Sequence, residues 1–273
     1  MAPKRSVQLS IGRIRFYCQA LVLATVCLAG GEAFAQPPAK SLVIGTIHMP
    51  PHSIEDTALP SFSREVFTEA MASQGYTVDI RFFPWARAFE LGKLGKVDAV
   101  WPSIREKERE AWFQFGSPVL HTNYVLIKRR DLPLSFRRLE DAKPYLVGTL
   151  RGGITGSALD HAGGEYRIEP NTSFGQNLQK LAAGRIDLMT GERYNAAYLL
   201  KNEFAPFNDA VEILFPTIST ISFYLMFSKN APDVGDKMQA FEKGLRTLRV
   251  NGRLAALLRR HGYDVGVALP KID

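Results

Sequence analysis

The chain has 273 residues, of which 46% are hydrophobic and 22% are charged. This balance is ordinary for a globular protein and argues against intrinsic disorder, and the length is sufficient for one large domain or two modest ones. Both cysteines, Cys18 and Cys27, lie within the first 35 residues. The rest of the chain is therefore expected to have no disulfide, no thiol nucleophile and no cysteine-ligated metal.

Residues 1–35 have the pattern of a secretory signal peptide. A basic start that includes Lys4 and Arg5 precedes an apolar stretch at residues 16–30, and a small-x-small triplet ends at Ala35. We expect cleavage after Ala35 and a periplasmic location; an uncleaved membrane anchor is the alternative, which the short apolar stretch disfavours. Cleavage would leave 30 basic and 26 acidic side chains. This small excess of positive charge does not indicate a nucleic-acid partner.

Apolar runs separated by glycine, proline and capping residues predict two successive α/β units, because strands and helices alternate as in a parallel sheet. The first unit is expected to have strands at 41–47, 76–83 and 97–101 and helices at 61–74, 85–94 and 104–112. The second is expected to have strands at 124–128, 145–149, 166–169, 185–190, 211–215 and 221–227, a turn into a helix at 151–157, and helices at 173–183 and 193–204. Two further helices are expected within 232–262, broken at Asn251 and Gly252.

Two segments, residues 93–100 and 181–189, repeat one pattern. Each ends an apolar helix, turns at a glycine and opens a short strand through an aspartate, Asp98 in the first segment and Asp187 in the second. We expect both aspartates to be structural, accepting hydrogen bonds from turn backbone groups. The repeat indicates two similar lobes. We place lobe 1 at 36–118 and 224–273, lobe 2 at 124–218, and a two-strand hinge at 119–123 and 219–223.

Several short motifs also occur in the order found in a known family. They include Phe83-Pro-Trp-Ala-Arg-Ala, Gly95-Lys-Val-Asp-Ala-Val, Phe115-Gly-Ser-Pro and Leu181-Ala-Ala-Gly-Arg-Ile-Asp. Together they resemble the polar amino-acid family of periplasmic solute-binding proteins, extracellular solute-binding protein family 3. The resemblance covers essentially all of the chain after the predicted signal peptide.

This resemblance implies a two-lobed α/β fold of the type II Venus-flytrap class, in which each lobe is a mostly parallel sheet flanked by helices. It also implies the substrate-binding component of an ABC importer. Such a protein is a monomer that binds an amino acid, or a related small polar carboxylate-bearing solute, between two closing lobes. A membrane permease then recognises the closed form.

Two charged residues are placed at the ligand by the resemblance. The family's carboxylate-binding arginine precedes the phenylalanine of the third motif by about six residues, which gives Arg109. A guanidinium fork can hold a carboxylate through two hydrogen bonds. Arg105 is an alternative, and so is a surface role for Arg109 within its charged run. The family's ammonium-binding acid corresponds to Glu192, where an aspartate is usual; the alternative is a helix cap.

Four further residues are predicted to contact the ligand. Trp85 occupies the position of an aromatic side chain that packs on the ligand in relatives, with a core role as the alternative. Thr155 precedes a predicted helix start, where free backbone N–H groups suit a carboxylate, with capping as the alternative. Met49 begins the loop expected to set specificity. Ser103 follows the third strand, next to Pro102, which lacks an N–H donor.

The chain shows no clear catalytic set or metal site. Its histidines lack metal-ligand spacing, and His48 and His52 in the first loop are interpreted as surface residues, with contact to the ligand as the alternative. We expect a binding protein without a cofactor rather than an enzyme. Two alternatives stay open. One is a periplasmic enzyme resembling the cyclohexadienyl dehydratases, with Glu192 as a general acid of raised pKa. The other is a sensor that reports to a membrane kinase or chemoreceptor.

Overall fold

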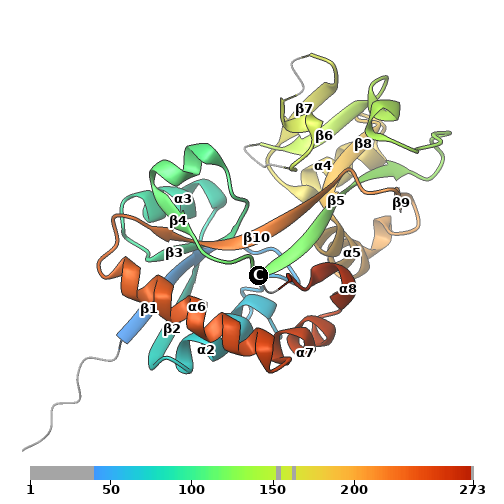
Figure 1. Ribbon diagram of the computed structural model, residues 1–273. Helices are drawn as coiled ribbons and strands as arrows, with labels where there is room; N and C mark the ends of the chain where they lie inside the picture. Colours follow the sequence, from blue (N-terminus) through green and yellow to red (C-terminus); the bar gives the residue numbers. More distant parts are fainter. Residues whose placement is uncertain (1–39, 152–154, 162–163, 272–273) are drawn as a thin grey trace, which may run out of the picture. The chain divides into compact units, whose positions relative to one another are not determined.

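The computed structural model describes residues 40–151, 155–161 and 164–271, and the predicted signal peptide lies outside these ranges. The chain from Lys40 onward forms one compact unit (Figure 1). Within the described ranges, no helix has both the length and the apolar character needed to cross a membrane.

The elements alternate between strands and helices over most of the described chain. The strands are β1 (Lys40–Thr46), β2 (Tyr76–Phe82), β3 (Ala99–Ser103), β4 (Phe113–Phe115), β5 (Leu120–Arg129), β6 (Leu146–Leu150), β7 (Arg167–Asn171), β8 (Leu188–Glu192), β9 (Val211–Ile213) and β10 (Ser219–Ser228). The α-helices are α2 (Phe62–Ala72), α3 (Trp85–Lys93), α4 (Phe174–Ala182), α5 (Arg193–Lys201), α6 (Val234–Val250), α7 (Arg253–Arg260) and α8 (Val265–Ala268). Short 3-10 helices are η1 (Lys107–Ala111), η2 (Leu139–Ala142), η3 (Ala158–His161) and η4 (Ala205–Phe207).

Two groups of parallel strands are joined by a pair of antiparallel strands. The strand order is β2-β1-β3-β10-β5-β8-β6-β7, with β4 beside β10 and β9 beside β5. In the first group β1 is parallel to β2 and β3, and in the second group β6 is parallel to β7 and β8. The long strands β5 and β10 run side by side between the groups (Figure 1), paired from Ser219 opposite Tyr124 to Phe223 opposite Leu120.

The repeated helix–glycine–strand segments form the same local structure in both groups. Gly95 and Gly184 turn the chain with φ of +66° and +68°, values that a glycine adopts without steric cost. The Asp98 carboxylate then accepts a hydrogen bond from the β1 backbone N–H of Val43 at 2.7 Å, and Asp187 accepts one from Leu146 of β6 at 2.8 Å. The predicted structural role of both aspartates is confirmed, but their side chains accept from backbone N–H groups of neighbouring strands and not, as predicted, from those of the turn.

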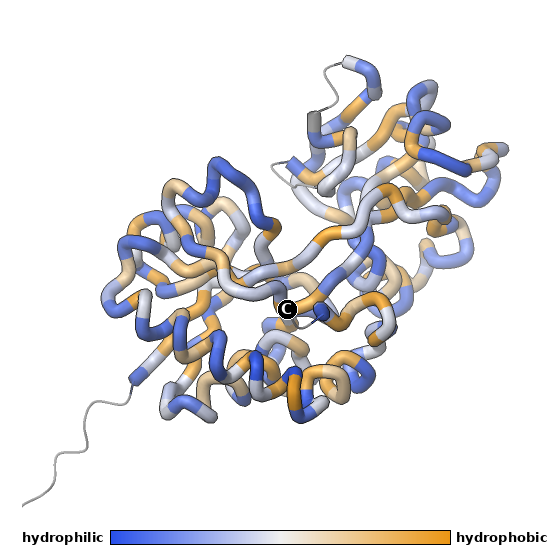
Figure 2. Tube along the Cα trace, in the orientation of Figure 1, coloured by the Kyte–Doolittle hydropathy of each residue, from blue (hydrophilic) through white to orange (hydrophobic). Residues whose placement is uncertain are grey.

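The largest hydrophobic core lies under the first group of strands. Helix α2 buries Phe62, Val66, Phe67, Ala70 and Met71, which recur at helical spacing, against the sheet and α6. In Figure 2, α6 and α7 alternate hydrophobic and hydrophilic positions, as expected for helices with one buried face. The second group of strands has its own clusters on its two faces, built around Ile127 and Leu126 of β5.

Most predicted elements are confirmed, and the largest error concerns the charged segment 104–112. It forms only the 3-10 turn η1, in which no residue is buried, rather than an α-helix. Helices gain most of their stability by packing an apolar face, and this segment has none to pack. The predicted helix after residue 157 is likewise only the 3-10 turn η3; residues 152–154 lie outside the described ranges.

Candidate functional site

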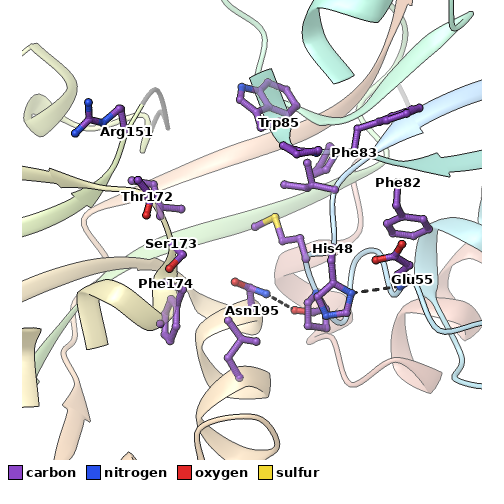
Figure 3. A pocket seen from close by; sticks show the side chains of 18 of the residues that line it. His48, Glu55, Phe82, Phe83, Trp85, Arg151, Thr172, Ser173, Phe174 and Asn195 are labelled. Atoms are coloured by element: carbon purple, nitrogen blue, oxygen red, sulfur yellow. Dashed lines mark hydrogen bonds between the residues drawn. The ribbon is translucent and has the colours of Figure 1, made fainter. Parts of the chain in front are cut away.

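A cavity of about 740 Å³ is lined by residues of both strand groups. Its walls come from the loop after β1, the start of α3, the segment from Pro102 to Arg109, the middle of β5, the loop before α4, and α5. Figure 3 shows Phe83 and Trp85 on one wall and Ser173 and Phe174 on the opposite wall. The volume is typical of a small-molecule site.

Aromatic side chains dominate the lining of this cavity. Its rings belong to Phe82, Phe83, Trp85, Tyr124, Phe174, Phe204 and Phe223. Phe174 and Phe204 lie against each other, with ring centroids 6.1 Å apart. The cavity therefore offers flat apolar surfaces on both sides, with few charged groups among them.

Two arginines line this cavity, Arg109 and Arg151. Arg151 is exposed, whereas Arg109 is half-buried against the aromatic wall. Nη1 of Arg109 donates hydrogen bonds to the Ser103 hydroxyl at 3.1 Å and to the Ile104 carbonyl at 3.0 Å. The guanidinium lies 5.4 Å from the centre of the Trp85 ring and 5.9 Å from that of Phe89. The side chain is half-buried, and this burial lowers the pKa of Arg109. Among the described residues it forms no ion pair, so Nε and Nη2 stay available to a ligand.

Trp85 and Met49 also line the cavity, as the sequence prediction requires of ligand contacts. Trp85 is half-buried, because one side of its ring packs near Phe89 while Arg109 lies over it. Met49 is held in a tight loop by backbone hydrogen bonds to Ser53 in both directions, each of 2.9 Å. Whether either residue binds a ligand stays a prediction.

Ser103 and Thr155 are both buried and engaged with the protein, and neither belongs to the described lining. The Ser103 hydroxyl accepts the hydrogen bond from Arg109 described above. The Thr155 hydroxyl bonds to Asp160 at 2.8 Å, and its backbone N–H also bonds to that carboxylate. Ser103 therefore orients Arg109, and Thr155 closes a turn together with Asp160.

Glu192 lies outside the described lining, in a buried network. Its carboxylate caps α5 by accepting hydrogen bonds from the backbone N–H groups of Tyr194 at 3.1 Å and Asn195 at 2.7 Å. It also accepts one from the Thr122 hydroxyl and one from His52 Nε2, the latter at 2.7 Å. The capping alternative of the sequence analysis thus describes what Glu192 does in this structure.

His52 is fully buried, which corrects its interpretation as a surface residue. Its Nδ1 bonds to the Tyr263 hydroxyl at 2.7 Å, so a chain of hydrogen bonds links Tyr263, His52 and Glu192. Burial alone would raise the pKa of Glu192, but the charge of His52, its hydrogen bond and those of Thr122 and Asn195 lower it overall. Glu192 therefore stays ionised near neutral pH, and a general acid of raised pKa is not what this geometry provides.

A second glutamate–histidine pair lies at the exposed edge of the cavity. His48 Nε2 and Glu203 Oε1 are 3.3 Å apart, with side chains 42% and 43% exposed. Nearby, the Asn195 amide donates to the Pro50 carbonyl at 2.6 Å, as the dashed line in Figure 3 shows. The described residues contain no cluster of histidine, aspartate or glutamate that could hold a metal ion.

Tyr124 is the main lining residue that sequence reasoning missed. It stands where β5 changes partners, opposite Ser219 of β10 and Glu192 of β8. Its hydroxyl forms no hydrogen bond with a described residue, and burial, followed by the charge of Glu192, raises its pKa. A strand position of this kind has no local sequence signal, because only the pairing of distant strands places it at the cavity.

Comparisons with known proteins agree with this architecture. Residues 42–263 match the model of the bacterial extracellular solute-binding proteins, family 3. The chain is also similar to the L-cystine-binding protein TcyA of Bacillus subtilis strain 168, with 23% identity over 215 residues that cover 78% of this chain and 77% of that protein.

Two solved structures show the same fold. A histidine kinase sensor domain with similarity to periplasmic binding proteins has a TM-score of 0.72 and 21% identity, covering 81% of this chain and 96% of that one. An arginine transport-system periplasmic binding protein from Legionella pneumophila has a TM-score of 0.69 and 18% identity, covering 81% of this chain and 99% of that one. The expected periplasmic-binding-protein-like α/β fold is thereby confirmed.

Proposed function

Because this chain belongs to the family 3 bacterial extracellular solute-binding proteins, we propose that it binds a small carboxylate-bearing solute in the cavity around Arg109. The main support for this proposal is the half-buried guanidinium of Arg109. It has no ion-pair partner among the described residues and faces an aromatic cavity. A desolvated cation of this kind favours an anionic ligand, because its hydrogen bonds to a carboxylate are stronger than those to neutral acceptors.

Binding is proposed to close two lobes over the solute. Lobe 1 comprises residues 36–118 and 224–273, and lobe 2 comprises residues 124–218. The paired segments 119–123 and 219–223 serve as the hinge, since they are the two places where the chain passes between the strand groups. A ligand held by Arg109 and Trp85 on one side and by α4 and α5 on the other would favour the closed arrangement.

The proposed setting is transport. Residues 1–35 would direct export to the periplasm, and the closed protein would deliver its solute to the permease of an ABC importer. The similarity to an L-cystine-binding protein and to an arginine transport-system binding protein supports this role. A sensor that reports to a membrane receptor is the second candidate, supported by the similarity to a histidine kinase sensor domain.

The test of the binding site compares Arg109→Gln with Arg105→Gln. Arg105 is an exposed neighbour that pairs with Glu110 at 2.8 Å, so its replacement changes net charge equally without altering the cavity. Thermal shifts of refolded protein would be measured with amino acids, including L-cystine, L-arginine and L-glutamate, and with simple carboxylic acids. We expect at least one carboxylate to bind, with affinity reduced about 10- to 100-fold in Arg109→Gln and unchanged in Arg105→Gln. Wild-type affinity in Arg109→Gln would show that the carboxylate site is elsewhere.

The identity of the membrane protein that binds the liganded chain distinguishes transport from sensing. Crosslinking of the liganded protein in intact cells, followed by identification of the captured membrane protein, should yield a permease subunit. Capture of a kinase or a chemoreceptor instead would favour the sensor.

A further inference from the structure

The charged side chains of the cavity offer a partner to a ligand's carboxylate but not to an α-ammonium group beside it. In an α-amino acid these two groups are attached to one carbon atom, so an ammonium must lie next to whatever holds the carboxylate. Around Arg109 the described lining includes Trp85, Tyr124 and Ile104 and no acidic side chain. The charge of Glu106 acts on Arg109, but Glu106 does not line the cavity.

Glu192 cannot serve the ammonium in this arrangement, because its hydrogen-bonding capacity is already used. A carboxylate has about four acceptor sites, and those of Glu192 receive Thr122, His52 and the backbone N–H groups of Tyr194 and Asn195. The Glu192 side chain is 1% exposed and that of His52 is 0% exposed. Recruiting Glu192 would require breaking its buried hydrogen bond with His52, which leaves Nε2 of His52 without its acceptor.

The acids that do line the cavity are Glu55 and Glu203, and both are exposed. Glu203 already pairs with His48. An ammonium beside Arg109 would instead meet the like charge of Arg109 itself, without an acidic side chain of the lining beside it to offset its desolvation. The position next to the carboxylate therefore disfavours a cation.

The rest of the lining suits a flat apolar group. Trp85 and Phe83 face Phe174 across a cavity larger than a single carboxylate requires (Figure 3), and Phe82 and Phe204 also line it. Aromatic rings pack favourably against such walls, in edge-to-face or offset arrangements. Burial of a ring would add affinity in proportion to the apolar area removed from water.

We propose that the cavity selects aromatic monocarboxylic acids that lack an α-ammonium group, such as arylalkanoic acids. This inference rests on the proposed function and specifies its ligand class. Arg109 holds the carboxylate and the aromatic walls enclose the ring, while Glu192 and His52 belong to the framework and do not contact the ligand.

The test uses three probes that share a phenylethyl group: 3-phenylpropionate, L-phenylalanine, which adds the α-ammonium, and 2-phenylethylamine, in which an ammonium replaces the carboxylate. Affinities would be measured by isothermal titration calorimetry on refolded wild-type protein, so the comparison of the probes needs no variant. Arg109→Gln is needed only to show that binding depends on Arg109. We expect 3-phenylpropionate to bind at least about tenfold more tightly than L-phenylalanine, and 2-phenylethylamine not to bind. Propionate, which lacks the ring, should also bind at least about tenfold more weakly.

The remaining outcomes separate this inference from the proposed function. If L-phenylalanine, or any α-amino acid, binds as tightly as 3-phenylpropionate or more so, and binding depends on Arg109, the ligand class is wrong and the proposed function stands. If no carboxylate of either kind binds in an Arg109-dependent manner, both are wrong. Arg105→Gln serves as the control whose selectivity should equal that of the wild type.

Discussion

Replacing Glu192 with alanine should destabilise the protein strongly, because it removes the centre of a buried network. The carboxylate accepts a 2.7 Å hydrogen bond from His52 and another of 2.7 Å from the backbone N–H of Asn195. Truncation leaves the buried Nε2 of His52 and the Thr122 hydroxyl without their acceptor, which costs about 1–3 kcal/mol for each unsatisfied group. It also removes the cap of α5, an effect of about 0.5–2 kcal/mol that overlaps with the first because the same carboxylate is lost.

We therefore expect Glu192→Ala to lower the free energy of unfolding by about 4 kcal/mol. Urea denaturation followed by circular dichroism would show this as a midpoint about 1.5 M lower, for an m-value of roughly 2–3 kcal/mol/M. The matched control is Glu203→Ala, which breaks the exposed pair with His48 and should cost about 0–1 kcal/mol. If the two variants differ by less than about 1 kcal/mol, the buried network does not stabilise the fold as argued.

Four further predictions concern pH, the repeated turns and the cavity. Because the pKa of Glu192 is lower in the folded protein than its ordinary value of 4.5, its stabilisation is complete above that value and is lost as pH falls through the folded pKa. The stability advantage of the wild type over Glu192→Gln, measured by urea denaturation, should accordingly shrink below pH 4.5; an advantage that grows there would contradict the assigned direction. Asp98→Ala removes the ion pair of Asp98 with Lys237, whose side chains are 8% and 12% exposed, and should lower the free energy of unfolding by about 3 kcal/mol. The control is Asp79→Ala, which removes an exposed ion pair; an equally small loss in both variants would contradict this prediction. Gly95→Ala should lower the Tm more than Gly184→Ala. Both variants have the left-handed strain of about 1–2 kcal/mol, but only at Gly95, of these two, would the added Cβ lie 2.4 Å from a backbone carbonyl oxygen. Equal changes in Tm would argue against that close contact. Trp85→Leu should weaken the binding of 3-phenylpropionate, measured by calorimetry, about three- to tenfold. Unchanged affinity would show that Trp85 does not contact the ligand.

The fold could be predicted well wherever local chemistry repeats. The helix–glycine–strand segments around Gly95 and Gly184 were recognisable because a positive φ and an aspartate at the strand start are local requirements. The strands β3 and β8 nevertheless begin later than predicted, at Ala99 and Leu188. The charged segment before Phe113 was overestimated as a helix because charge spacing alone does not supply a packed face.

The site was only partly predictable, for a similar reason. The family motifs gave Arg109 and Trp85, and the position of the first loop gave Met49; these three line the cavity, whereas the predicted Ser103, Thr155 and Glu192 do not. The partners of Glu192 could not be foreseen, because His52 lies 140 positions away in sequence and no local pattern marks it as buried. Tyr124 was missed because its place depends on which strands pair with β5.

The most direct test of the central claim is mass spectrometry of small molecules released from natively purified protein. The wild type would be compared with Arg109→Gln, both purified without refolding. We predict that the wild type releases a carboxylic acid in near-stoichiometric amount, and that the variant retains at least about tenfold less of it. Equal amounts of one molecule from both proteins, or a released ligand without a carboxylate, would contradict the assignment of Arg109 and its aromatic cavity as the ligand site.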